Sequence, residues 1–193
     1  MSSPAQPLLE AGRVYRTRDL ARWGGNTPRL AKRLVAQGRL VPLAHGLFAY
    51  PERSRFGEVP PADEELMRAF LDGTPFVFTG PQRWNALGLG STAVFATPLV
   101  YNTKRSGTFE LGGRRFLLRR VAFPADPPAE WFVVDLLENA EKAGVSLSAL
   151  VAALTRALGR AAFDRERLQQ LAHEYGSKTT AALVDAALEA TST

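Results

Sequence analysis

The sequence contains no cysteine and only two histidines, His45 and His173, among 193 residues. The absence of cysteine excludes disulfide bonds, thiolate metal sites and cysteine nucleophiles, and it is typical of a reducing compartment. The shortage of histidine argues against a histidine-rich metal site. We therefore expect a cytoplasmic protein that binds no metal and no cofactor.

Membrane-directing segments are also missing. No stretch of about 20 residues is predominantly apolar, as a spanning helix requires. The first residues do not place a basic region before an apolar run, as a signal peptide does. Hydrophobic residues make up 46% of the chain and charged residues 22%, which is close to the globular average and excludes a disordered or collagen-like chain. We expect no membrane partner.

Positive charge is concentrated at the start of the chain. Residues 1–55 contain ten Lys and Arg against three Asp and Glu, a net charge of +7, whereas the rest has fourteen against sixteen, a net charge of −2. A basic module followed by a nearly neutral one is typical of a nucleic-acid-binding segment joined to a segment with another task. A solvated basic surface is the plainer alternative.

Two short helices joined by a glycine-containing turn are predicted in this basic segment. Thr17 is a suitable N-cap for a helix from Arg18 to Trp23, which would end at two glycines. Pro7–Gly12 could supply another short helix before it. A second helix is predicted from Pro28 to Gln37, with Asn26 and Thr27 as good N-cap residues and proline in its first turn. This arrangement is that of a helix-turn-helix.

The second of these helices has one apolar and one basic face. Leu30 and Leu34 lie four residues apart and share a side, whereas Arg29, Lys32 and Arg33 occupy the other. In a helix-turn-helix the second helix enters the major groove, where arginine can bind guanine. An ordinary amphipathic helix with a solvated face is the alternative. We predict DNA contacts from the residues of this helix, its caps and the following turn: Thr17, Arg18, Asn26, Thr27, Arg29, Lys32, Arg33 and His45.

The segment after the second helix predicts a hairpin. Residues 39–50 read as strand, tight turn and strand, with Ala44, His45 and Gly46 in the turn. A hairpin in this place is the wing of a winged helix, but this one is mostly apolar. Its strands therefore indicate sheet packing under the helices, and His45 is as consistent with a solvated turn as with a DNA contact.

The remainder predicts a second domain. Pro51–Asp63 contains three prolines and reads as a linker, so we place a winged helix-turn-helix domain in residues 1–54 and a second domain in residues 55–193. The overall class is α+β, with an antiparallel sheet followed by a C-terminal helical bundle. The predicted helices are Asp63–Leu71, Pro81–Leu87, Val133–Ala143, Leu147–Leu158, Arg165–Tyr175 and Lys178–Ala190, and the predicted strands are Phe76–Thr79, Val94–Tyr101, Thr108–Leu111 and Arg114–Val121.

No constellation of catalytic residues stands out. The sequence has no nucleophile-elbow signature and no phosphate-binding loop of the usual spacing. Asp135, Glu138 and Glu141 lie three residues apart and could share a helix face, for which a solvated surface is the favoured interpretation. Asp126 and Glu130 have no strand lysine near them in the sequence to complete a nuclease site. We therefore expect no enzymatic activity.

Four arginines form a second basic group. Arg114, Arg115, Arg119 and Arg120 belong to one predicted strand, and alternation places two on each face. They are consistent with contact to RNA or to an acidic partner. We favour the plainer interpretation that they lie at the rim and bond carboxylates such as Glu110.

The sequence resembles a known family along roughly residues 13–145. The motif TRDLARWGGNTPRLAKRLVAQGRLVPLAHGLFAYP resembles the winged helix of AbiEi-type antitoxins, including Gly38-Arg39-Leu40 and His45-Gly46-Leu47-Phe48. FTGPQRWNALGLGSTAVFATPLVYNTKRSGTFELGGRRFLLRR and FVVDLLENAEKAG resemble later segments of that family. The wing is less basic, and the region before Thr17 shorter, than in many members.

The resemblance implies a function. Such proteins are antitoxins of type IV toxin–antitoxin or phage abortive-infection systems. Their winged helix represses transcription of their own operon at inverted repeats in double-stranded DNA, and their C-terminal domain counters a nucleotidyltransferase-like toxin. The alternative is a stand-alone winged-helix regulator whose second domain binds a ligand or mediates dimerisation. An enzyme tethered to DNA by the winged helix is a third, less favoured class.

Overall fold

A computed structural model describes residues 7–92, 94 and 97–191. Its helices and strands make a mixed α and β chain of the expected α+β class. The chain forms two compact units: unit 1 comprises residues 1–76 and 108–116, and unit 2 comprises residues 77–107 and 117–193. This division differs from the expected one, because the chain returns to unit 1 after first leaving it.

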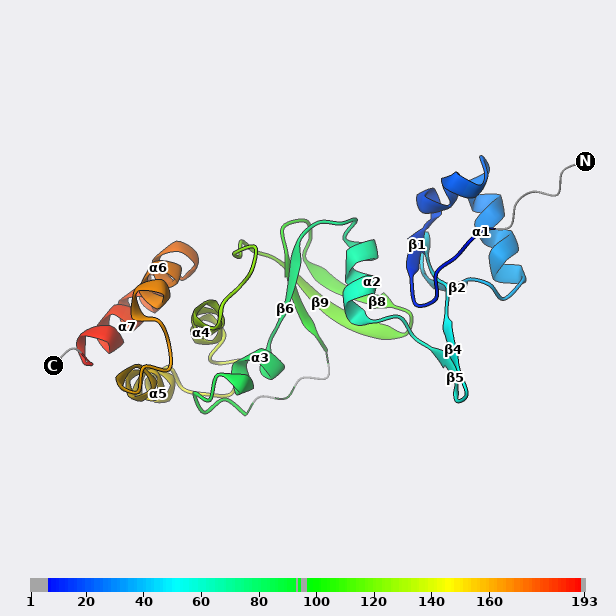
Figure 1. Cartoon of the computed structure of the whole chain (residues 1–193). Helices are drawn as coiled ribbons and strands as arrows, with labels where there is room; N and C mark the ends of the chain where they lie inside the picture. Colours follow the sequence, from blue (N-terminus) through cyan, green and yellow to red (C-terminus); the bar gives the residue numbers. More distant parts are fainter. Residues whose placement is uncertain (1–6, 93, 95–96, 192–193) are drawn as a thin grey trace, which may run out of the picture. The chain divides into compact units, whose positions relative to one another are not determined.

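Unit 1 contains a three-stranded antiparallel sheet in the order β1-β3-β2, from β1 (Val14–Arg16), β2 (Val41–Ala44) and β3 (Leu47–Ala49). A 3-10 helix, η1 (Thr17–Trp23), and the helix α1 (Thr27–Ala36) pack together above it (Figure 1). Their shared core contains Tyr15, Leu20, Leu30, Ala31, Leu34 and Leu40. Leu30 and Leu34, predicted to share the apolar side of the second helix, are therefore buried.

Three expectations for unit 1 are wrong. Arg16, and not Thr17, is the N-cap of η1, because Thr17 is already the first residue of that helix. No helix forms in the segment Pro7–Gly12, and the strand β1, which the pattern did not predict, follows it instead. The proline-rich segment expected to be a linker contains a hairpin of β4 (Glu52–Ser54) and β5 (Gly57–Val59). Strands of three residues are too short to show a clear alternation of apolar and polar residues. Their formation depends on the partner strand that supplies their hydrogen bonds.

The helix α2 (Asp63–Phe70) completes the described helices of unit 1. Leu66 and Met67 are fully buried, and α2 packs on β1. Its Glu65 accepts a hydrogen bond from the Val14 backbone at 3.2 Å. The acidic first turn predicted for this helix is present, and one of its carboxylates is used to hold the neighbouring strand.

The larger sheet has the strand order β6-β7-β9-β8, from β6 (Phe76–Thr79), β7 (Leu99–Asn102), β8 (Gly107–Leu111) and β9 (Arg114–Arg120). Strands β7 and β9 are parallel, with Leu99 opposite Leu117. The sheet expected to be antiparallel therefore contains a parallel pair. Local turn signals reveal hairpins, but they do not reveal which distant strand will insert between two others. The expected strand began at Val94; residues 95–96 lie outside the described part, and β7 begins at Leu99.

The helices of unit 2 are α3 (Pro81–Ala86), α4 (Ala129–Glu138), α5 (Leu147–Gly159), α6 (Arg165–Tyr175) and α7 (Lys178–Glu189). The side chains of Ser146, Asp164 and Ser177 accept hydrogen bonds at the starts of α5, α6 and α7, as predicted. Helix α4 contacts α3, α6 and α7 and lies beside them in Figure 1. Most of α4 is consequently buried, and it forms the centre of this unit's core.

Candidate nucleic-acid interface and a buried carboxylate

The amino end of α1 is fixed by its own cap. The Asn26 side chain accepts a hydrogen bond from the Arg29 backbone at 3.1 Å, and Pro28 occupies the first turn, where a missing N–H costs nothing. Leu30 and Leu34 then anchor one face of the helix in the core. The orientation of α1 about its axis is thereby set by packing.

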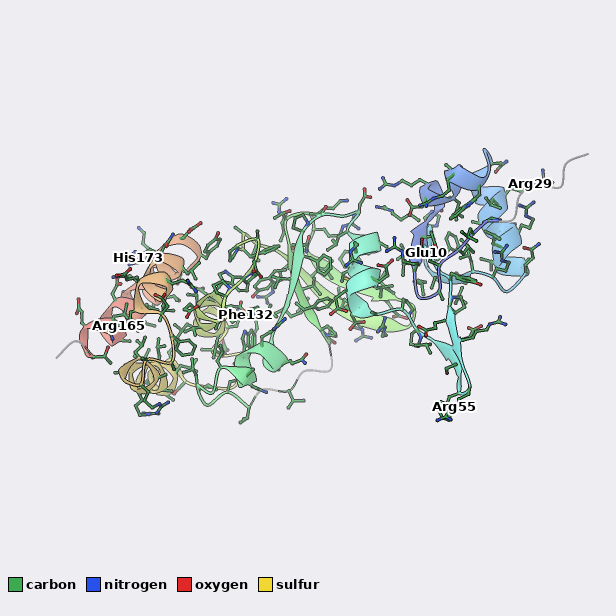
Figure 2. All side chains as sticks on the ribbon, in the orientation of Figure 1. Glu10, Arg29, Arg55, Phe132, Arg165 and His173 are labelled. Atoms are coloured by element: carbon green, nitrogen blue, oxygen red, sulfur yellow. The ribbon has the colours of Figure 1, made fainter. Side chains whose placement is uncertain are left out.

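The opposite face of α1 is basic and free. Arg29, Lys32 and Arg33 are exposed, and the described part of the chain offers none of their side chains an ion pair. Figure 2 shows Arg29 pointing outward from α1. Three cations on neighbouring turns, together with the positive N-terminal end of the helix, make a surface that attracts phosphate.

Other arginines of unit 1 are used internally. Arg16 pairs with Asp72 at 3.0 Å, and Arg18 pairs with the same carboxylate. Arg68 pairs with Glu65 at 2.6 Å. The contrast shows that the lack of partners on α1 is a property of that face and not of the whole basic segment.

Two of the remaining predicted contact residues, Thr17 and His45, lie around the turn between β2 and β3. The backbone N–H of Thr17 donates to the Gly46 carbonyl at 3.0 Å, and His45 is exposed at the turn. A hollow beside α1 is lined by Thr17, Lys32 and His45, among others. Asn26 and Thr27 lie at the start of α1. Arg18 differs from the rest, since Asp72 already binds its guanidinium.

The four strand arginines have three kinds of surroundings. Arg114 pairs with Asp63 at 2.5 Å and donates to the Pro61 carbonyl at 2.7 Å. Arg119 donates to the Asn139 side chain at 3.4 Å. Arg115 and Arg120 are exposed. The partners thus come from segments distant in sequence, and the suggested partner Glu110 is not one of those seen in the described residues.

The interpretation of Asp135 as part of a solvated helix face is wrong. Its side chain is buried, with 5% exposed, and it accepts four hydrogen bonds. Trp84 and Tyr101 each donate at 2.7 Å, Asn139 donates at 3.0 Å, and Thr79 donates from β6. Asp135 therefore joins α4 to β6, α3 and β7. The only sequence signal for this was a charged residue inside the apolar run FVVDLL, which marks a buried polar position.

Burial raises the pKa of Asp135, while its donors and the positive charge of Arg119 act in the opposite direction. Burial, followed by the adjacent charge of Asp135, raises the pKa of the Tyr101 hydroxyl above its ordinary value, so this hydroxyl stays a donor. The four donors supply what an ionised carboxylate requires of a dry interior. The hydrogen bonds to Asp135 therefore hold together the interior of unit 2.

A pocket of about 230 Å³ lies next to this cluster in unit 2. Its lining includes the polar side chains of Tyr101, Arg119, Asn139 and Lys142, and the apolar wall includes Trp131. Burial, and then the charge of Arg119, lowers the pKa of Lys142. An apolar wall with a few converging polar groups is the usual form of a small-molecule site.

Carboxylates elsewhere do not gather. Glu130 is buried and accepts a hydrogen bond from the Asp164 backbone at 2.9 Å, so it fixes the start of α6. Within residues 7–92, 94 and 97–191, no group of three or more histidine, aspartate or glutamate side chains is placed to hold a metal ion. Over the same residues, no helix is long and apolar enough to cross a membrane.

The geometry defines a mixed α and β chain with a free basic helix face in one unit and a buried carboxylate cluster in the other. No family model and no curated protein matches the chain. It is similar to the crystal structure of the RV2827C protein from Mycobacterium tuberculosis, with 17% identity and a TM-score of 0.48, over 93% of this chain and 72% of that one.

Proposed function

We propose that the protein binds double-stranded DNA through α1, acting as the recognition helix of a winged helix-turn-helix. One observation supports this above the others: Arg29, Lys32 and Arg33 share an exposed face without ion pairs, while arginines nearby are paired. Helix α1 would enter the major groove with its N-terminal residues toward the bases. The turn at His45 would lie along the same duplex.

The wider proposal is that of a cytoplasmic antitoxin and repressor. By its sequence resemblance to AbiEi-type antitoxins, the protein would repress its own operon at inverted repeats, and its C-terminal part would counter a nucleotidyltransferase-like toxin without catalysing a reaction. Arg115 and Arg120 are exposed and would be available to such a partner, whereas Arg114 is engaged with Asp63.

The DNA-binding proposal is tested by neutralising the free face of α1. The variant R29Q/K32Q/R33Q should lose affinity for the duplex upstream of its own gene by about 100-fold or more, because it removes the three cations proposed to contact DNA. Each lost phosphate contact should also flatten the salt dependence by about one unit of slope. Fluorescence anisotropy at several salt concentrations measures both quantities. Because these side chains are exposed, the melting temperature should not change.

A matched control neutralises exposed arginines elsewhere. R115Q/R120Q/R160Q also removes three positive charges, all from exposed arginines outside α1, and it should retain affinity within about threefold. Equal losses in the two variants would show non-specific attraction to net charge and would overturn the assignment of α1. For the antitoxin role, co-expression of this protein should restore the growth of cells that are arrested by a nucleotidyltransferase encoded beside its gene.

The pocket in unit 2 favours a second candidate, a stand-alone winged-helix regulator whose second part binds a ligand. The two candidates share DNA binding and differ in what unit 2 contacts. Failure to relieve toxicity, combined with a change in DNA affinity on addition of a small molecule, would select the regulator.

A further inference from the structure

The pocket between the end of β9, α4 and Tyr175 has a built arrangement of groups. Arg119 and Lys142 supply two cations, Trp131 contributes an apolar wall, and Tyr101 and Asn139 lie beside them with their donors already bonded to Asp135. We propose that this pocket binds a small organic anion consisting of one aromatic ring and one carboxylate, with the carboxylate on Arg119 and Lys142. The proposal does not depend on DNA binding.

Size limits the ligand. The volume of about 230 Å³ lies below the range of about 300–1,000 Å³ of sites for drug-sized molecules. It accommodates one ring with an acidic substituent. Val121, Val134 and Trp131 line the pocket, and such apolar groups gain free energy by covering a ring.

The two cations lack a contacting counterion. Neither Arg119 nor Lys142 makes an ion pair in the described part of the chain, and the guanidinium contact to Asn139 is long, at 3.4 Å. The remaining N–H groups of Arg119 are available for the fork-like binding that arginine gives a carboxylate. Adjacent like charges cost free energy, so an anion that binds between them relieves that cost.

The charge balance favours a single negative charge on the ligand. The oxygens of Asp135 are occupied by four donors, and its charge offsets one of the two cations. Glu138 also lines the pocket, but its carboxylate accepts the Ser177 backbone N–H at 2.6 Å, at the positive end of α7. With Glu138 ionised as well, the two cations and the two carboxylates balance, so a ligand with one negative charge adds less excess charge to the pocket than a phosphate dianion does.

Benzoate is the probe that tests the proposal on the full chain. Its binding, followed by tryptophan fluorescence and by melting temperature, should saturate with a Kd of about 1 mM or lower. Acetate, which lacks the ring, should bind about tenfold more weakly. Saturable binding with this order of affinities supports the proposal, whereas no saturation by about 10 mM benzoate overturns it. Equal binding of acetate overturns the role of the ring.

Variants locate the site. R119Q and K142M should each weaken benzoate binding about tenfold, because each removes one charge-assisted contact. R119K keeps the charge but loses the fork, so it should bind benzoate more weakly than the parent and more tightly than R119Q. The control R120Q changes the exposed neighbour of Arg119 on the strand and should bind as the parent does. If R119Q proves unfolded, the exposed Lys142 carries the test through K142M. Unchanged binding in K142M, or tighter binding of phenyl phosphate than of benzoate, overturns the proposal.

Discussion

The cations of α1 and the carboxylate of Asp135 differ in burial and in the partners that the fold gives them. The cations of α1 are exposed and lack ion pairs within the described residues, whereas Asp135 is buried and accepts four hydrogen bonds. A charge left without a partner at the surface costs little, because water solvates it. A charge in the interior persists only when the fold supplies every partner. The cations of α1 are therefore available to another molecule, whereas the hydrogen-bonding capacity of Asp135 is used within the fold.

The largest expected effect comes from breaking the interior arrangement. Asp135→Ala removes the acceptor of Trp84 and Tyr101 and leaves their donors buried without a partner. We expect the free energy of unfolding to fall by about 3–5 kcal/mol in a denaturant titration. Glu141→Ala, an exposed change in the turn after α4, should cost less than about 0.5 kcal/mol. Similar losses in both variants would contradict the role of the cluster.

A backbone position in unit 1 provides the next effect. Gly112 has a φ of +57°, and its N–H donates to the Leu43 carbonyl at 2.8 Å. An added Cβ would lie 2.8 Å from a Leu43 methyl group. Gly112→Ala should therefore destabilise the fold by about 1–3 kcal/mol, as measured by chemical unfolding. Gly113→Ala shares the positive φ but meets nothing within 4 Å, so it should cost less. The reverse order would show that Leu43 does not constrain this turn.

The cap of α1 separates helix formation from charge. Asn26→Ala removes the acceptor for the Arg29 backbone N–H and should cost about 1 kcal/mol of unfolding free energy. Asn26→Asp keeps an acceptor and should retain the stability. Because the three cations remain in both variants, DNA affinity should fall far less than in R29Q/K32Q/R33Q. A loss as large as in that triple variant would mean that Asn26 itself carries the recognition.

The smallest effect concerns a carboxylate of intermediate character. Burial acts to raise the pKa of Glu138, but hydrogen bonds from Thr180 and Ser177 outweigh it and lower that pKa. The folded state therefore favours the ionised form, and its contribution is present above the ordinary pKa of glutamate and lost as pH falls through the folded value. In Glu138→Gln this part of the acid sensitivity should disappear. Its size is below about 0.5 kcal/mol after solvent screening, measurable as a difference between melting curves at pH 7 and pH 3.5. An identical pH dependence in both proteins would contradict the shift.

Local signals located the helices from α1 to α7, although the helix expected in Pro7–Gly12 does not form and α4 begins at Ala129 and not at Val133. The predicted caps at Asn26, Ser146, Asp164 and Ser177 are the ones that accept hydrogen bonds. The apolar spacing at Leu30 and Leu34 identified the buried face, and the basic face follows from it. These features depend on residues within a few positions of each other, so the order of residues along the chain contains the information.

Distant partners could not be read in this way. The parallel pairing of β7 with β9, the ion pair of Arg114 with Asp63 and the donors around Asp135 each join segments separated by many residues. Asp135 fits a solvated helix face by spacing alone, and only the position of α4 within unit 2 buries it. The sequence by itself thus determined the class of fold, the helices and the basic face of α1, because short-range spacing sets them. The tertiary structure alone decided which charged groups are paired or hydrogen-bonded within the fold, because the free energy of a charge depends on the groups that packing places around it.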